Sequence, residues 1–171
     1  MAYAIRRARP PEYELLPDIE RAAATLFEGV DWPNQGQIEP FSVEFIEAVA
    51  RSGAVFVAAD NHDAPVGFAL TSFLDRALYI HELDVSPPHG RRGLGRRLID
   101  AACACAAENG APAVTLSTFR DIPWNGPFYA KAGFREVPRN QWTPGFHLLH
   151  HREVELGLPV DRRCFMRKDL P

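Results

Sequence analysis

The stretch that decides the fold is Ser86–Ala102, which reads SPPHGRRGLGRRLIDAA. Its three glycines and four arginines lie between a proline pair and an apolar run with helical spacing. At the start of a helix, several main-chain N–H groups have no partner within the helix and point outward. Glycine lets an anion approach the main chain, and arginine surrounds it with positive charge. The stretch therefore predicts a site for a phosphate or pyrophosphate group.

Two familiar phosphate-binding motifs do not fit this stretch. A P-loop ends in Gly-Lys-Ser/Thr, whereas Gly95 is followed by Arg96 and Arg97. The dinucleotide-binding fingerprint requires a third glycine three positions after Gly95, where Leu98 stands. Neither a nucleoside triphosphate nor a nicotinamide cofactor is therefore expected. The remaining alternative, which spacing alone leaves open, is a glycine-rich turn with solvated arginines and no ligand.

Periodicity and turn residues predict an α+β chain. The expected strands are 3–10, 54–60, 66–75, 77–86, 112–119, 134–137 and 162–170. The expected helices are 10–27, 41–53, 94–110, 126–133 and 145–158. Short turns join the three strands between residues 54 and 86, which predicts an antiparallel meander. The length of 171 residues favours a single domain over residues 1–171.

Composition and charge give no sign of a nucleic-acid or membrane partner, because the net charge is −3 and 46% of the residues are hydrophobic. Cys103, Cys105 and Cys164 lack metal-ligand spacing, and no N-terminal apolar segment resembles a signal peptide. These features favour the reducing cytoplasm. His147 and His151 have the spacing of a helical metal-binding pair, but no third ligand accompanies them, so no metal is expected.

Two motifs resemble those of the GNAT superfamily, the acyl-CoA-dependent N-acetyltransferases. Residues 85–95, VSPPHGRRGLG, are similar to the family's Val-x-Pro strand end followed by Gln/Arg-x-x-Gly-x-Gly/Ala. Residues 127–134, PFYAKAGF, are similar to its xxYxKxGF element. The matches cover roughly residues 55–137, and the order of strands and helices agrees. The resemblance implies a GNAT-like fold, with a mixed, mostly antiparallel central sheet of about seven strands flanked by helices.

The resemblance implies acetyl-CoA as co-substrate, with its pantetheine arm on the edge of strand 77–86 where that strand diverges from strand 112–119. The pyrophosphate is then expected on the main-chain N–H groups of residues 91–96. Gly90 stands where the family has Gln or Arg, so Arg91 or Arg92 is expected to supply that polar contact. Asn125 is either a cofactor contact or a helix cap. The expected cofactor-binding residues are Leu83, Asp84, Val85, Gly90, Arg91, Arg92, Gly93, Leu94, Gly95, Arg96, Asn125, Phe128 and Tyr129.

Amide formation from a thioester requires a neutral amine, so a base must take a proton from the ammonium form that predominates at pH 7. The resemblance to the GNAT superfamily implies that a carboxylate on strand 77–86 has this role. Glu82 is the expected base, and His81 is the second candidate. Adjacent strand residues point to opposite faces, so at most one of the two is expected to face the cleft, while Asp84 shares a face with Glu82. The alternative for Glu82 is a carboxylate that is solvated or paired with an arginine.

The leaving thiol defines a second catalytic position. A thiolate leaves more easily when a proton is supplied, and Tyr129 matches the family's donor. The alternative is a core tyrosine that packs with Phe128 and Phe134.

The expected function is transfer of an acetyl group from acetyl-CoA to a primary amine by direct attack in a ternary complex. The alternatives are an acyl-CoA-binding regulator without turnover and a binding protein for another phosphate-bearing nucleotide. Small-molecule amines and peptide or protein amines both stay open as acceptors, although the net negative charge favours a cationic one. A homodimer is the commonest assembly, and the sequence neither supports nor opposes it.

Overall fold

The computed structural model describes residues 2–31 and 38–171, and its elements follow the order expected from the sequence. The strands are β1 (Ala4–Arg7), β2 (Gly53–Ala59), β3 (Pro65–Leu74), β4 (Ala77–Val85), β5 (Ala113–Phe119), β6 (Arg135–Glu136) and β7 (Arg163–Asp169). The α-helices are α1 (Leu16–Ala24), α2 (Val43–Ser52), α3 (Leu94–Glu108), α4 (Gly126–Lys131) and α5 (Pro144–Glu155). Short 3-10 turns cover Pro10–Leu15, Thr25–Phe27, Pro87–His89, Arg139–Gln141 and Val160–Arg162.

The strands form one seven-stranded sheet in the order β1-β2-β3-β4-β5-β7-β6. Every neighbouring pair is antiparallel except β4 and β5, which run parallel. The parallel pair needs a crossover, and α3 supplies it across one face of the sheet. The expected α+β fold with a mixed, mostly antiparallel sheet of seven strands is therefore confirmed.

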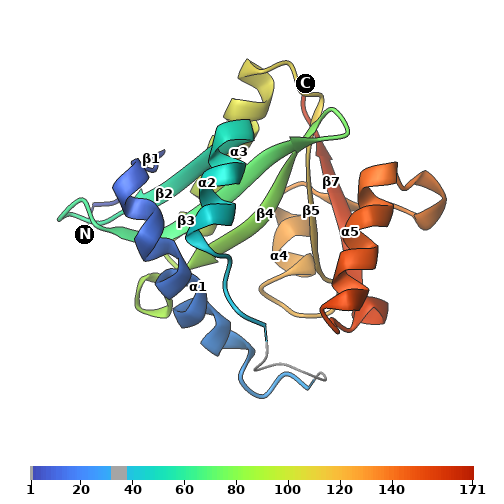
Figure 1. The fold of residues 1–171 in the computed structure, drawn as a ribbon, viewed down its shortest axis with the longest axis horizontal. Helices are drawn as coiled ribbons and strands as arrows, with labels where there is room; N and C mark the ends of the chain where they lie inside the picture. Colours follow the sequence, from blue (N-terminus) through green and yellow to red (C-terminus); the bar gives the residue numbers. More distant parts are fainter. Residues whose placement is uncertain (1, 32–37) are drawn as a thin grey trace.

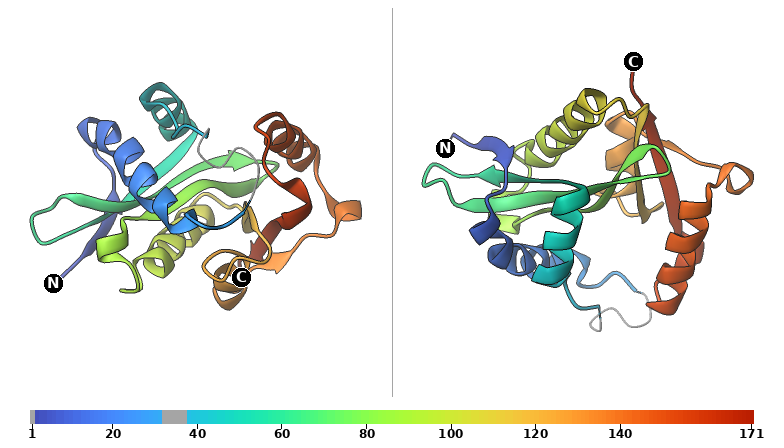
Figure 2. Two further views of the ribbon diagram at one scale, coloured as in Figure 1. Left: turned by 90° about the horizontal axis from the view of Figure 1, so that it is seen from below. Right: turned by 45° about the horizontal axis from the view of Figure 1, so that its top comes forward.

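The helices lie on both faces of this sheet. Figure 1 gives the arrangement along the chain, and the left view in Figure 2 shows α1, α2 and α5 on one side with α3 and α4 on the other. The first face is buried by α1 and α2 over β2 and β3, through Leu16, Ile46, Val57, Phe68 and Leu70. Further along the same face, Phe146 of α5 packs on β4 and β7. Between α1 and α5 this face carries a cleft, which is described in the next subsection.

The expected helix 10–27 is divided into a 3-10 turn, α1 and a second 3-10 turn. Pro17 lies within the first two positions of α1 and has no N–H to continue a hydrogen-bond ladder from the preceding turn. Pro10 and Pro11 begin the first turn in the same way. Helix propensity alone did not predict this division.

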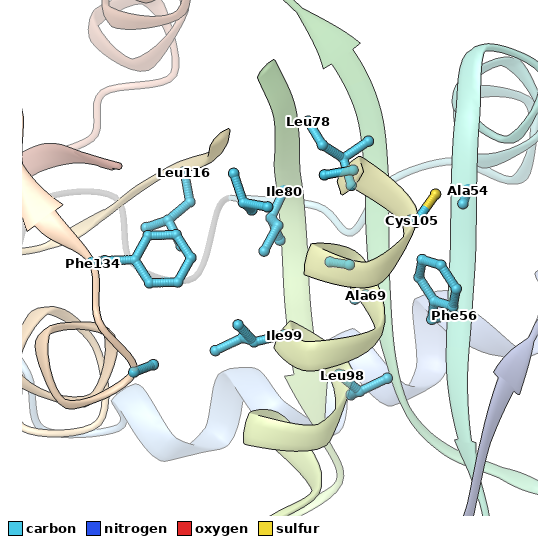
Figure 3. Packing of buried hydrophobic residues seen from close by; sticks show 14 of the residues in the cluster. Ala54, Phe56, Ala69, Leu78, Ile80, Leu98, Ile99, Cys105, Leu116 and Phe134 are labelled. Atoms are coloured by element: carbon cyan, nitrogen blue, oxygen red, sulfur yellow. The ribbon is translucent and has the colours of Figure 1, made fainter. Parts of the chain in front are cut away.

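The opposite face is closed by the apolar stripe of α3. Leu98 and Ile99 are fully buried, and they belong to one cluster with Ala69, Leu78 and other residues of the central strands (Figure 3). The stripe repeats at helical spacing, as the sequence predicted. It fixes the position at which α3 begins, and therefore the position of the glycine-rich turn at its N-terminus.

We expect Leu98→Ala to lower the free energy of unfolding by about 2–5 kcal/mol, because the substitution leaves a cavity where the core cannot fully collapse. Urea unfolding followed by circular dichroism measures this change. Leu148→Ala is the matched control, since Leu148 is 72% exposed and the expected change is within about 0.5 kcal/mol. Equal effects of the two substitutions would contradict the assignment of α3 to the core.

Candidate active site

The two parallel strands separate after a short paired region. Their register joins Leu78–Ile80 of β4 to Val114–Leu116 of β5. Beyond it, β4 continues to Val85 beside β3, and β5 continues to Phe119 beside β7. Among the residues that the structure describes, no strand pairs with the main-chain groups of residues 82–85 on the side that faces β5. Such an edge can pair with an extended ligand.

The turn after β4 presents a row of main-chain N–H groups. Gly93 is the N-cap of α3, with φ +74°, and Arg91 is also left-handed, with φ +57°. The N–H of Gly90 donates to Pro87, and that of Arg97 donates to Gly93. In the described part of the chain, the N–H groups of residues 91–96 have no such acceptor. Consecutive N–H groups at a helix start are a favourable place for an anion.

The four arginines of this turn have different surroundings. The guanidinium of Arg92 lies 5.9 Å from the ring centroid of Tyr3, and Arg97 donates to the Tyr3 carbonyl at 2.9 Å. Arg96 forms an ion pair with the next turn of α3. Arg91 and Arg96 line the cleft that contains the turn. Arg92 packs beside Tyr3, just before β1, and is not among the residues that line this cleft; its expected contact with the cofactor stays a prediction.

Glycine is favoured at positions 93 and 95 for different structural reasons. Nothing lies within 4 Å of a Cβ built on Gly93, but its positive φ favours glycine. A Cβ on Gly95 would lie 3.3 Å from Cζ of Phe128 and 3.6 Å from Cδ2 of Leu83. Gly95 therefore allows close packing of α4 and β4 against the start of α3. Its expected role in letting a phosphate approach the main chain stays a prediction.

A cleft of about 1820 Å³ joins the phosphate-binding turn to the space between α1 and α5. Ligand sites commonly occupy about 300–1,000 Å³, so this cleft has room for two substrates. Of the residues expected from the sequence, the cleft is lined by His81, Glu82, Leu83, Asp84, Val85, Gly90, Arg91, Gly93, Leu94, Gly95, Arg96, Asn125, Phe128 and Tyr129.

A β-bulge brings both candidate bases to the same face of β4. The β3–β4 register passes from Leu70 opposite Glu82 to Thr71 opposite Ile80, so His81 is the additional residue. The His81 ring packs edge-on against Tyr79 and hydrogen-bonds Oγ of Ser72 through Nε2 at 2.7 Å. The expectation that at most one of His81 and Glu82 faces the cleft is therefore wrong, because regular alternation does not hold across a bulge.

Glu82 is one of three neighbouring carboxyl groups in the cleft. Asp84 lies two residues further along β4, opposite Phe68 on the face covered by α1, as the alternation from Glu82 predicted. Glu20 comes from α1 and accepts a hydrogen bond from the main-chain N–H of Phe41 at 3.1 Å. Burial raises the pKa of Glu82 to about 7, although the positive charge of Arg163 opposes the shift.

The other two carboxyl groups are shifted in the same direction. Burial, followed by the charge of Glu82, raises the pKa of Glu20 to about 8. The same two causes raise the pKa of Asp84 well above its usual value. His81 is shifted the opposite way, because burial disfavours its charged form and lowers its pKa to about 4. At neutral pH the imidazole is therefore uncharged, while the pKa of Glu82 is shifted toward neutral pH.

Tyr129 packs with Phe128 and Phe134 and also reaches the carboxyl groups. Its ring makes edge contacts with both phenylalanines. Burial, followed by the charges of Glu82 and Asp84, raises the pKa of the Tyr129 hydroxyl, which is therefore protonated at neutral pH. Tyr129 thus packs against core phenylalanines and also lines the cleft.

Asn125 occupies the N-cap position of α4, but its side chain makes no capping hydrogen bond. Its Oδ1 instead accepts from the hydroxyl of Thr118 on β5 at 3.0 Å, and the residue lines the cleft. The helix-cap alternative therefore describes only the backbone position of this residue.

Sequence reasoning missed a polar wall at the far side of the cleft. Arg163 of β7 lies 2.9 Å from Glu153 of α5, and both side chains contact the hydroxyl of Ser117. These residues are distant in sequence and belong to no motif. Glu20 was also missed, although it follows Leu16 by one helical turn and so lies beside the buried stripe of α1. That position was a usable signal.

The described residues contain no group of three His, Cys, Asp or Glu side chains arranged to hold a metal ion. His147 packs near Trp142, and His151 lies 3.6 Å from Glu155. Within the same residues, no helix has both the length and the apolar character needed to cross a membrane.

The structure thus places a cleft where the parallel strands β4 and β5 diverge, beside a turn with open main-chain N–H groups. The sequence profile of the Acetyltransferase (GNAT) family matches residues 17–134, so the chain belongs to this family and is an acyl-CoA-dependent transferase. The match includes β4, the glycine-rich turn and Tyr129.

Solved structures agree with this fold. A GNAT-family acetyltransferase from Staphylococcus aureus Mu50 is 21% identical, with a TM-score of 0.73 over 99% of this chain and 100% of that chain. The PaiA N-acetyltransferase of Thermoplasma acidophilum, solved with coenzyme A, is 16% identical, with a TM-score of 0.72 over 99% and 100%. The ribosomal-protein-S18-alanine N-acetyltransferase of Escherichia coli is 18% identical, with a TM-score of 0.68 over 98% and 94%.

The raised pKa of Glu82 predicts a pH-dependent stability. Between pH 4.5, the ordinary pKa of a glutamate side chain, and about pH 7, the folded protein holds a proton at Glu82 that the unfolded chain has lost. This group therefore lowers the free energy of unfolding progressively as pH rises through that window. We expect Glu82→Gln to become more stable relative to the wild type from pH 5 to pH 8, by more than about 1 kcal/mol.

Urea unfolding at several pH values measures this difference. Glu14→Gln is the matched control, because Glu14 is an exposed side chain outside the cleft, and its difference from the wild type is expected to stay flat. A flat difference for Glu82→Gln as well would mean that Glu82 is not buried as described.

Proposed function

We propose that the protein transfers an acetyl group from acetyl-CoA to a primary amine by direct attack in a ternary complex. The observation that carries this proposal is that one cleft contains the unpaired N–H groups of residues 91–96, the free edge of β4 and the Glu82 carboxyl. The coenzyme A complexes known for structures of this fold support the choice of co-substrate. The family supports the choice of reaction.

The cofactor's diphosphate binds to the N–H groups of residues 91–96, with Arg91 and Arg96 beside it. The pantetheine arm pairs with the main chain of Leu83 and Val85, whose side chains pack toward α3 and leave the edge open. The acetyl thioester then lies near the separation of β4 and β5. This arrangement leaves the space between α1 and α5 for the acceptor.

Glu82 is the base in this proposal. A base works best when its pKa is near the working pH, and the pKa of Glu82 is raised to about 7 while that of His81 is lowered to about 4. The Nε2 atom of His81 is also engaged with Ser72. Glu82 accepts a proton from the ammonium group, directly or through water, and the neutral nitrogen attacks the thioester carbonyl.

Tyr129 acts on the leaving group. As the C–N bond forms and the C–S bond breaks, the sulfur gains negative charge and takes a proton. The Tyr129 hydroxyl is protonated at neutral pH and has no hydrogen-bond partner among the described residues. It therefore donates a hydrogen bond to the departing sulfur, and the proton that the nitrogen loses as the amide forms passes to the thiolate, so that Tyr129 ends protonated.

We expect coenzyme A to raise the melting temperature, and ATP and NAD to leave it unchanged, because a ligand stabilises only the state that it binds.

Arg91→Gly removes a charge while keeping the left-handed turn accessible, and it is expected to weaken coenzyme A binding about tenfold. Isothermal titration calorimetry measures the affinity, with exposed Arg51→Ala as control. Equal affinities for all three proteins would place the diphosphate elsewhere.

We expect Glu82→Gln to lower kcat/KM by about 10²–10⁴-fold, and to remove the acidic limb near pH 7 from the pH profile. Tyr129→Phe is expected to lower kcat with less effect on KM. Thiol release from acetyl-CoA in the presence of primary amines measures both. His81→Asn is the comparison, since its expected effect is smaller than that of Glu82→Gln. Coenzyme A binding without thiol release from any amine would instead indicate a regulator.

A further inference from the structure

A second pocket lies at the other end of the same sheet face, where the β3–β4 turn, the start of β5 and the end of β7 meet (Figure 1). Its volume is about 360 Å³, which is within the range of sites for small molecules. Phe146, which lines this pocket, and Tyr79, which lines the cleft, belong to one buried cluster with Phe165. This apolar cluster separates the two cavities, and among the described residues they have no lining residue in common.

Three polar side chains form a row along one side of this pocket. The β5–β7 register places Thr115 opposite Arg167, and the β6–β7 register places Arg167 opposite Arg135. Residues directly opposite each other in an antiparallel pair point to the same face of the sheet. All three residues line the pocket, so it receives one hydroxyl and two guanidinium groups from neighbouring strands. Like charges placed opposite each other in this way destabilise a sheet.

Two of the carboxyl groups around the pocket are engaged with groups outside the row. Both oxygens of Glu136 accept hydrogen bonds from Arg120, and the shortest of these contacts is 2.8 Å. Asp75, in the β3–β4 turn, accepts from the main-chain N–H of Gly145 at 2.8 Å. Asp75 thus lies at the N-terminus of α5, where the helix dipole stabilises a negative charge. Neither carboxyl group pairs with an arginine of the row.

The two arginines of the row have donors to spare. Arg167 donates through Nε to Asp169 at 2.7 Å, which offsets its charge and leaves its two Nη atoms unused. Arg135 has no ion-pair or hydrogen-bond partner in the part of the chain that the structure describes. A guanidinium group has donors and no acceptor, so what the row offers to a ligand is hydrogen-bond donors. This favours an anion.

Thr115 is a second observation that points to a ligand. The residue is only 3% exposed and lines the pocket, and among the described residues its hydroxyl has no hydrogen-bond partner. Other buried threonines are satisfied: the hydroxyl of Thr71 donates to the Ala54 carbonyl at 2.7 Å, and that of Thr118 donates to Asn125 at 3.0 Å. Buried polar groups are normally hydrogen-bonded, so this hydroxyl is available to a group that enters the pocket.

We propose that this pocket binds a small oxyanion, a carboxylate or phosphate group, between Arg135 and Arg167, with the Thr115 hydroxyl as a third donor. Guanidinium groups present pairs of N–H donors that match two oxygens of either group. The anion offsets the charge of Arg135 and satisfies the hydroxyl. The site is separate from the cleft and does not depend on the acetyl transfer proposed above.

An NMR titration of the ¹⁵N-labelled protein tests this site directly. Inorganic phosphate and succinate are added in separate titrations, with the ionic strength held constant by sodium chloride. The amide signals of Thr115, Arg135 and Arg167 are expected to shift and to saturate at about millimolar concentrations of at least one anion. The signals of Gly93 and Gly95 report separately on the turn of the cleft. The tighter of the two anions identifies the group that the pocket prefers.

Arg135→Gln is expected to weaken the binding measured at Thr115 and Arg167 about tenfold, because a charged donor is lost. Its matched control is Arg51→Gln, an exposed arginine of α2, which is expected to keep the wild-type affinity at this pocket. Signals at the turn of the cleft are expected to respond alike in all three proteins.

Thr115→Val removes the hydroxyl while keeping the shape of the side chain. It is expected to weaken anion binding by about three- to tenfold and to change the melting temperature by less than about 2 °C, because no bond within the protein is lost. Thr71→Val is the matched control for folding. It leaves the Ala54 carbonyl without its partner and is expected to lower the melting temperature by about 3–6 °C.

Three outcomes would overturn the proposal. The first is the absence of saturable shifts at Thr115, Arg135 and Arg167 with both anions. The second is an equal affinity of the wild type and Arg135→Gln. The third is a loss of stability in Thr115→Val as large as that in Thr71→Val, which would mean that the hydroxyl is bonded within the protein. Thiol release from acetyl-CoA tests the proposed transfer separately, so the two proposals can fail independently.

Discussion

The separation of β4 and β5 after Ile80 and Leu116 is the constraint on which the site depends. A parallel pair inside a sheet normally continues its ladder, and here the ladder ends while both strands go on. Each strand remains tied to its other neighbour, β3 or β7, so the gap is held open by the rest of the sheet. Below the gap, α3 fills one face with an apolar stripe, and its N-terminus is thereby fixed at the mouth of the opening.

The placement of charged groups in the cleft follows from this frame. The start of α3 brings main-chain N–H groups and two arginines to one end of the opening. The bulge at His81 brings Glu82 and Asp84 to the face under α1, where Glu20 joins them. Burial is the main reason that these carboxyl groups resist ionisation, and the charge of Glu82 adds to it at Glu20 and Asp84. The arrangement of β4, α1 and α3 therefore raises the pKa values of Glu20, Glu82 and Asp84.

Much of this arrangement was readable from the sequence, because it depends on local pattern. The apolar spacing of α3, the strands of the meander and the paired motifs around Gly93 and Tyr129 all have local signatures. They predicted the fold and the part of the cleft lining that comes from β4, the glycine-rich turn and α4, but none of the lining residues from α1, α2 and α5. Three features were not readable. The bulge at His81 depends on the β3–β4 register, and the role of Gly95 depends on the approach of Phe128. Arg163 meets Glu153 only through the packing of α5 on β7.

Tyr3, just before β1, links the edge of the sheet to the anion-binding turn. Its hydroxyl lies 3.0 Å from Nδ1 of His89, its carbonyl accepts from Arg97, and its ring lies under Arg92. An edge strand is ordinarily the first part of a sheet to fray. Because the turn contacts Tyr3 through three of its residues, a ligand that orders the turn is expected to reduce fraying of the β1 edge strand as well. Amide hydrogen exchange at Ala4 and Ile5 would thus register a ligand that those residues never touch.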